Sequence, residues 1–356
     1  MSSTTSTVLN KPIVRDSGIE MLRILAACGV VILHYNGSIA LSLVREGSMN
    51  SYILLFLEGL FICAVNVFVL ISGYFLSGTT RRRAIKAIEL VVQVAVMGLG
   101  LYIGSSVLSG SFKVGDALFS AIPNNYFMSL YITLYLVSPY INLAINKLSD
   151  KNLVRMAGLF LLLFSVWPTL LDVIAETSGF TFGGLYTTNA SGSQFGYSIV
   201  NFALMYLLGA VLKRKNFAPP KYLCLITLLA CVAVLLPWQL YMPQIARAYC
   251  NPLVVLLAVL VFLLFRGFNF KSRLINTLSK SAFTCFLIHG IFLSRIKIEL
   301  FVNASPILLL LHILASAVAI YLVSFVVWAI YDFVTKPIFK LLGSKLCRLD
   351  ALLSTE

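Results

Sequence analysis

Long apolar runs, separated by short polar segments, dominate the chain. A helix rises about 1.5 Å per residue, so roughly 18–20 apolar residues cross the ~30 Å hydrocarbon layer of a bilayer. The pattern therefore predicts an all-α, polytopic membrane bundle of about ten transmembrane helices. The predicted spans are residues 19–40, 52–76, 84–108, 124–146, 153–174, 197–212, 221–240, 251–267, 281–301 and 307–334.

Basic residues give this bundle a direction. If alternate loops are assigned to the cytoplasm, starting with the N-terminus, that side holds 21 of the 27 lysines and arginines. The opposite side holds five, which are Arg45, Lys113, Arg247, Arg295 and Lys297. Cytoplasmic loops are enriched in Lys and Arg. We therefore expect both termini to be cytoplasmic and the protein to lie in a cell membrane.

Composition agrees with this interpretation. Hydrophobic residues make up 60% of the 356 positions and charged residues 11%, well below the roughly 25% of soluble domains. The net charge of +14 comes from the clusters between apolar runs, so topology explains it and nucleic acid is not an expected partner. The seven cysteines lie mostly in apolar runs without metal-ligand or redox spacing, as expected of small buried hydrophobic residues.

The chain divides into one membrane domain with short ends. We expect a flexible cytoplasmic tail over residues 1–17, the membrane domain over 18–340, and a cytoplasmic tail over 341–356. The first apolar run resembles a signal peptide, but it is too long and contains Arg23 and His34, so we interpret it as a retained span. The outward loop at about 175–196, rich in Gly, Thr and Ser, is either a lid or a plain connector.

Ionisable side chains within spans are costly and mark functional sites. Arg23 and His34 are eleven residues apart on the first span. At about 100° per residue they lie on one helix face, about 16 Å apart along the axis. Arg23 then lies near the cytoplasmic surface, where a guanidinium can bind phosphate, and His34 lies deeper, where an imidazole can accept a proton from a hydroxyl. Alternatively, Arg23 reaches lipid phosphates and His34 makes an interhelical hydrogen bond.

Other polar residues add to this pattern. Glu58 in the second span can pair with Arg23 or His34, or fill a structural role. His289 lies near the middle of the ninth span. Arg81, Arg82, Arg83 and Lys86 set topology and can also bind an anionic cytosolic ligand.

Five stretches of the sequence resemble one family. They are Arg23 and His34 with ten residues between them; Asn-Val-Phe-Val-Leu-Ile-Ser-Gly-Tyr-Phe-Leu at 66–76; Leu-Tyr-Leu-Val-Ser-Pro at 134–139; Tyr-Leu-Leu-Gly at 206–209; and Thr-Cys-Phe-Leu-Ile-His at 284–289. Their order over ten spans is similar to that of the membrane acyltransferase 3 family, which includes O-acetyltransferases of bacterial surface polysaccharides. Members commonly show Arg-x-x-Arg after the second span, where this chain has Arg83 and Lys86.

The resemblance implies an acyltransferase. It implies transfer of an acyl group, usually acetyl, from a cytosolic acyl-CoA to a sugar hydroxyl of a polysaccharide or lipid-linked glycan, with no tightly bound cofactor. His34 would act as general base or carry the acyl group, and Arg23 would assist. The donor would bind Arg23, Arg82, Arg83 and Lys86. The substrate-binding residues would be Glu58, Ser72, Tyr131 and His289.

A transporter or flippase is the main rival. Ten spans with polar residues on one helix face also suit a permease. Paired internal repeats with broken helices would favour that class, and the sequence shows no obvious repeat. The soluble-enzyme motifs for nucleotides, zinc and serine nucleophiles are absent from the sequence.

Overall fold

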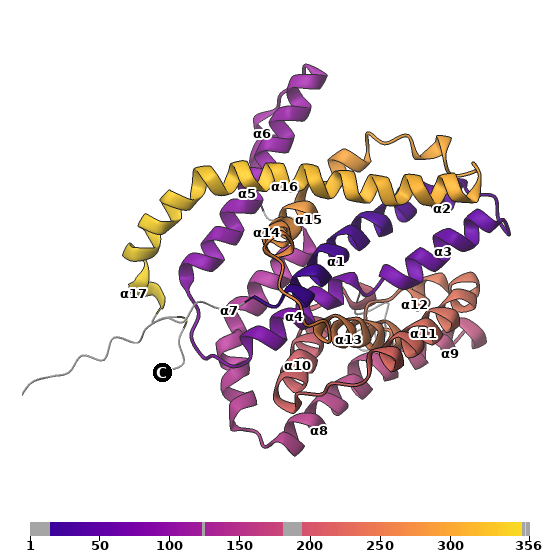
Figure 1. The fold of residues 1–356 in the computed structure, drawn as a ribbon, viewed down its shortest axis with the longest axis horizontal. Coiled ribbons are helices and arrows are strands. Elements are labelled where there is room, and N and C mark those ends of the chain that lie inside the picture. The colour runs from indigo at the N-terminus through magenta and orange to yellow at the C-terminus, as the bar shows by residue number, and fades with distance from the viewer. Residues whose placement is uncertain (1–14, 123–124, 181–193, 351–352, 354–356) are drawn as a thin grey trace, which may run out of the picture.

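A computed structural model describes residues 15–122, 125–180, 194–350 and 353, and the regular elements among them are helices. Figure 1 shows α1 and α4 near the middle of the bundle, α16 across one side, and α8 and α9 on the opposite side. The longer helices are α1 (Ser17–Tyr35), α3 (Met49–Phe61), α4 (Ala64–Leu76), α5 (Ala84–Ser109), α6 (Val114–Ala121), α7 (Tyr126–Lys147), α8 (Asp150–Leu161), α9 (Trp167–Ser178), α10 (Ile199–Lys215), α11 (Lys221–Tyr241), α13 (Pro252–Arg266), α15 (Ala282–Leu293) and α16 (Pro306–Lys345). The short elements are α2 (Leu41–Leu43), α12 (Pro243–Ala246), α14 (Arg273–Leu278), α17 (Cys347–Asp350), the π-helices η1 (Asn36–Ala40) and η2 (Leu162–Val166), and the 3₁₀ turns η3 (Gln194–Gly196), η4 (Ser279–Ser281) and η5 (Ile298–Leu300).

The structure is that of a helical membrane protein. Within the described residues, seven helical segments are long and apolar enough to cross a bilayer: Ser17–Tyr35, Met49–Leu76, Ala84–Ser109, Tyr126–Lys147, Asp150–Ser178, Lys221–Tyr241 and Pro306–Gly343. Helices also occupy the other three predicted spans, but α10, α13 and α15 are shorter. The span count of ten and the side of the termini stay predictions.

Several predicted boundaries were wrong. The ninth span was expected to continue to residue 301, yet α15 ends at Leu293. The following segment carries exposed Arg295, Lys297 and Glu299, but it turns back so that Ile298 is buried. The last helix runs eleven residues beyond its predicted end at 334. Residues 1–14 and most of the 175–196 loop lie outside the described residues.

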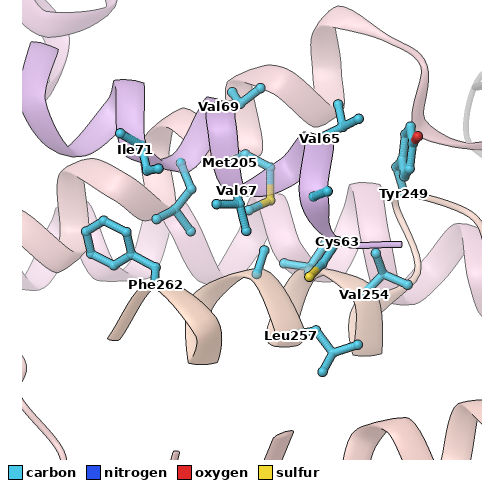
Figure 2. Packing of buried hydrophobic residues seen from close by; sticks show 14 of the residues in the cluster. Cys63, Val65, Val67, Val69, Ile71, Met205, Tyr249, Val254, Leu257 and Phe262 are labelled. Carbon is cyan, nitrogen blue, oxygen red and sulfur yellow. The ribbon is translucent and has the colours of Figure 1, made fainter. Parts of the chain in front are cut away.

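The first helix lies between two hydrophobic clusters. Leu22 and Val30 pack in the larger one, which contains α4, α10 and α13, while Ala27 and Val31 pack in a smaller one with α15 and α16. Figure 2 shows part of the larger cluster, where Val67 of α4 lies beside Met205 of α10. The cysteines whose surroundings are described are free, and five of these six are buried, as their apolar context predicted.

Two glycines bring α4 and α10 into backbone contact. A Cβ at Gly73 would lie 2.2 Å from the carbonyl oxygen of Tyr206, and a Cβ at Gly209 would lie 2.3 Å from that of Leu70. Small residues at membrane helix interfaces allow such close packing. These glycines belong to the 66–76 and 206–209 stretches, so the two sequence motifs meet in the fold and fix the position of Ser72.

We expect Gly209→Ala to destabilise the protein by about 1–3 kcal/mol, because the added methyl group meets backbone atoms that cannot rotate away. The matched control is Gly100→Ala in α5, where nothing lies within 4 Å of the new Cβ. At that position the better helix propensity of alanine should stabilise the folded protein by about 0.5–1 kcal/mol. Thermal unfolding in detergent measures both changes. If the two substitutions changed the free energy of unfolding equally, the close contact between the backbones of α4 and α10 would be contradicted.

Candidate functional site

A cavity of about 860 Å³ opens between α4, α5, α7 and α15. It brings together six of the nine residues that the sequence analysis assigned to a site: Arg23, Ser72, Arg82, Arg83, Lys86 and Tyr131. These residues come from positions between 23 and 131 along the chain, so the fold, rather than their proximity in sequence, assembles them. The cavity is therefore the principal candidate site.

One wall of the cavity is an aromatic stripe on α7. Phe127, Tyr131 and Tyr135 recur every four residues, which places them on one helix face over about 12 Å. Ser72 of α4 faces this stripe, with its Oγ 3.0 Å from the Tyr131 hydroxyl. Because the Ser72 hydroxyl donates to the Phe68 carbonyl, the Tyr131 hydroxyl is the donor in that pair. We call this cavity, which has the aromatic stripe of α7 on one wall and the Ser72 hydroxyl facing it, the slot.

The cavity is strongly cationic. Its lining includes seven basic residues and one acid, Glu89. Glu89 accepts from Lys86 at 2.6 Å, and Glu20 lies 3.9 Å from Arg23. The excess of positive charge favours anionic ligands over cationic ones.

Arg82 is committed to the protein rather than to the open cavity. Its side chain is only 4% exposed. Its Nε donates to Ser138 at 2.8 Å, and its terminal nitrogens donate to Thr79, to main-chain carbonyls including that of Leu76, and to Tyr206. Because a guanidinium has five N–H donors, these bonds leave little capacity for a ligand. Arg82 therefore holds the turn from which exposed Arg83 and Lys86 project.

Two histidines form a pair near the part of the slot that Phe286 lines. The rings of His34 and His289 have centroids 4.7 Å apart. Phe286, which lines the cavity, lies one turn before His289 on α15, with its ring centroid 6.2 Å from that of His289. The two imidazoles therefore lie next to this part of the slot.

The proton positions on His289 follow from its partners. The His289 Nδ1 lies 2.8 Å from the Phe286 carbonyl oxygen and 3.1 Å from that of Cys285. Carbonyl oxygens only accept, so Nδ1 carries a hydrogen and the Nε2 of the neutral ring carries the lone pair. His289 is buried, whereas His34 is exposed at the end of α1. The pair thus joins a fixed imidazole to an accessible one.

Glu58 is connected to this pair through Asn36. Its carboxylate accepts from the Asn36 Nδ2 at 3.0 Å, and the same amide group donates to the Leu54 carbonyl. Asn36 follows His34 by two residues and begins the π-helix η1. π-Helical turns often occur at functional sites. Glu58 therefore binds the side chain of Asn36 rather than Arg23 or His34, and Arg23 has Glu20 as its partner.

Some residues of the site were not singled out from the sequence. Arg15 and Lys280 line the cavity but were counted only as topology determinants. Gln93 also lines it and donates to Thr284 at 2.9 Å. Two features of the sequence could have indicated residues of this site. They are the four-residue spacing of aromatic residues from Phe127 to Tyr135 and the amide of Gln93 within the apolar run of α5.

Comparison with known proteins agrees with this arrangement. The model of the acyltransferase domain family, acyltransferase 3, matches residues 16–329. The chain belongs to this family. The match begins at the N-cap of α1 and ends within α16, so it includes both histidines and every residue of the cavity lining except Arg15. No curated protein and no solved structure matches the chain.

Membership of this family supports an acyltransferase-type function in a membrane protein. An acyltransferase needs a site for an acyl donor and a group that assists attack on the acyl carbon. The cationic slot and the adjacent imidazoles offer these two parts in neighbouring positions.

Proposed function

We propose that this acyltransferase transfers an acetyl group from acetyl-CoA, entering from the cytoplasm, to a hydroxyl of a cell-surface or lipid-linked polysaccharide. The observation that carries the proposal is the cationic slot whose lining reaches Phe286, one turn before His289, whose ring lies beside that of His34. The mouth of the slot is the part lined by Arg23, Arg83 and Lys86. Acetyl-CoA has matching parts: an anionic nucleotide, a slender arm and a terminal thioester.

The donor would enter with its thioester first. Arg23, Arg83 and Lys86 would hold the diphosphate at the mouth through charge-assisted hydrogen bonds. The arm would lie along Phe127, Tyr131 and Ser72, whose hydroxyl and aromatic groups suit its amides and methylenes. The thioester would then lie beyond Phe286, beside the two histidines.

His34 would act as general base on the acceptor. Its imidazole takes the proton of the sugar hydroxyl while that oxygen attacks the thioester carbon, which breaks the C–S bond and forms the O–C bond. The imidazolium then returns the proton to the departing thiolate, so the products are the acetyl ester and the free thiol. His289, whose hydrogen is on Nδ1, would use its Nε2 lone pair to keep the neighbouring His34 ring in the required tautomer and orientation.

A second route uses the same residues. The His34 nitrogen attacks the thioester carbon and releases the thiol of CoA, and the acceptor hydroxyl then attacks the acyl-imidazole. In that route His34 loses its acyl group with each acceptor, and donor and acceptor need not be present together. Both routes require His34 to be accessible, which it is.

Mass spectrometry of surface glycans tests the proposed function. Cells that lack the protein should lose acetyl esters from one glycan, while the amount of that glycan at the surface is unchanged, and the wild-type chain should restore the esters. A transporter or flippase would give the opposite result, because the glycan itself would be missing. An unchanged acetyl content would contradict the proposal.

A further inference from the structure

A second hollow adjoins the cavity near its mouth. Its volume is about 350 Å³. Its lining comes from the start of α1 and from α14 with its flanks: Arg15, Lys271, Ser272, Arg273, Asn276, Thr277 and Lys280. Arg15 and Lys280 line both spaces, so the second hollow continues from the cationic mouth.

The second hollow carries positive charge without an acid in its lining. Four of its residues are basic: Arg15, Lys271, Arg273 and Lys280. Glu20 lies 3.6 Å from Arg15, and the ammonium of Lys280 lies over the Trp328 ring. Within the described residues, no ion pair engages exposed Lys271 or Arg273. These two cations are therefore available to an anionic ligand.

Hydrogen bonds fix the frame of the second hollow. Buried Ser17 donates to the Asn276 Oδ1 at 2.9 Å and accepts from the Ser272 backbone N–H at 2.9 Å. Arg15 donates to the Asn276 carbonyl at 3.3 Å. The segment that carries Lys271 and Arg273 is thus tied to the beginning of α1, which also carries Arg23 on its next turn. The positions of the two cationic sites relative to one another are set by this frame.

We propose that the second hollow binds the 3′-phosphate of the acyl-CoA nucleotide, an inference that rests on the proposed function. With the diphosphate at Arg23, Arg83 and Lys86, the adenosine would extend past Lys280 into the second hollow. A phosphomonoester carries about −1.5 to −2 charges at pH 7 and requires more than one cation. Lys271 and Arg273 supply two, and Asn276 and Thr277 supply polar groups beside them.

Phospholipid headgroups are the other source of phosphate near this surface, and basic residues here also follow the topology rule. The phosphate chemistry is shared, so the test must separate the nucleotide from the lipid. Two thioesters allow this separation. 3′-Dephospho-acetyl-CoA keeps the thioester, the arm and the diphosphate of acetyl-CoA and lacks only the 3′-phosphate. If the second hollow binds the 3′-phosphate, the protein binds acetyl-CoA more tightly than 3′-dephospho-acetyl-CoA. A site for lipid phosphate does not produce this difference.

The experiment measures binding of acetyl-CoA and of 3′-dephospho-acetyl-CoA to the full chain in phosphatidylcholine nanodiscs. Wild-type protein should prefer acetyl-CoA by about tenfold or more, the range of a charge-assisted hydrogen bond or two. The variant Lys271→Gln/Arg273→Gln should bind both thioesters with nearly equal affinity. The control Lys151→Gln/Arg155→Gln removes two exposed charges from α8, away from both cavities, and should keep the wild-type preference.

Each other outcome overturns the inference in a recognisable way. If the Lys271→Gln/Arg273→Gln variant keeps the preference, the 3′-phosphate is not bound here. If that variant keeps it but no longer gains thermal stability when phosphatidylglycerol is added to the nanodiscs, the second hollow binds lipid phosphate. If wild-type protein binds neither thioester, the proposed donor itself is wrong. If it binds both with equal affinity, the proposed donor stands and the site for the 3′-phosphate is wrong.

Discussion

His34→Ala is expected to lower the rate of acyl transfer by roughly 10²–10⁴, the usual contribution of a general acid–base group. His34 is exposed at the end of α1, so its removal leaves no cavity in the core. The variant should therefore keep wild-type thermal stability and donor affinity. Transfer is measured as acetyl esters formed on glycan per amount of protein in the membrane. Normal esterification by the variant would exclude His34 from the chemistry.

The same assay separates the two roles of His34. With acetyl-CoA and no acceptor, an acyl-imidazole route releases one thiol per protein in a burst, and His34→Ala abolishes the burst. A general-base route releases no thiol until acceptor is present. If His289→Ala abolished transfer while His34→Ala spared it, the assignments of the two rings would be exchanged.

The helices were largely predictable because the length of an apolar run encodes a membrane helix directly. Helix ends were not. The run through residue 301 contains enough apolar residues to continue α15, yet Ile298 is buried instead by a turn that packs against neighbouring helices. Only tertiary contacts decide that outcome. In the same way, the second predicted span consists of two helices that meet at Ile62 and Cys63.

The site was predictable where helix periodicity sets it. Arg23 and His34 share a face of α1 by spacing alone. Their partners were not predictable: Glu58 was a candidate partner for either residue, but packing places Glu20 beside Arg23 and Asn36 beside Glu58. Arg82 and Arg83 show the limit best, since they are adjacent in sequence and one is buried while the other is exposed. The sequence of three consecutive arginines does not indicate which of them the fold buries.

Arg82→Gln is expected to destabilise the protein by about 2–5 kcal/mol. Hydrogen bonds from a charged donor contribute about 1.5–3 kcal/mol each, and glutamine replaces at most two of those that Arg82 makes. The loss reaches three elements, since Ser138 lies on α7, Tyr206 on α10 and Leu76 at the end of α4. Asn142 contacts the same Leu76 carbonyl and the Tyr206 hydroxyl, which limits the loss because these groups keep one partner. Thermal unfolding and the yield of folded protein measure the effect.

Arg83→Gln is the matched control, because it removes the same charge one residue later. Arg83 is exposed and lines the cavity mouth, so unfolding should change by no more than about 0.5 kcal/mol. Acetyl-CoA binding should instead weaken by about tenfold, the loss expected for one charge-assisted contact to phosphate. The pair of variants thus distinguishes Arg82, which stabilises the fold of the site, from Arg83, which contacts the donor. Weakened binding with full stability in Arg82→Gln would reverse these roles, because it would mean that the guanidinium leaves its protein partners to reach the phosphates.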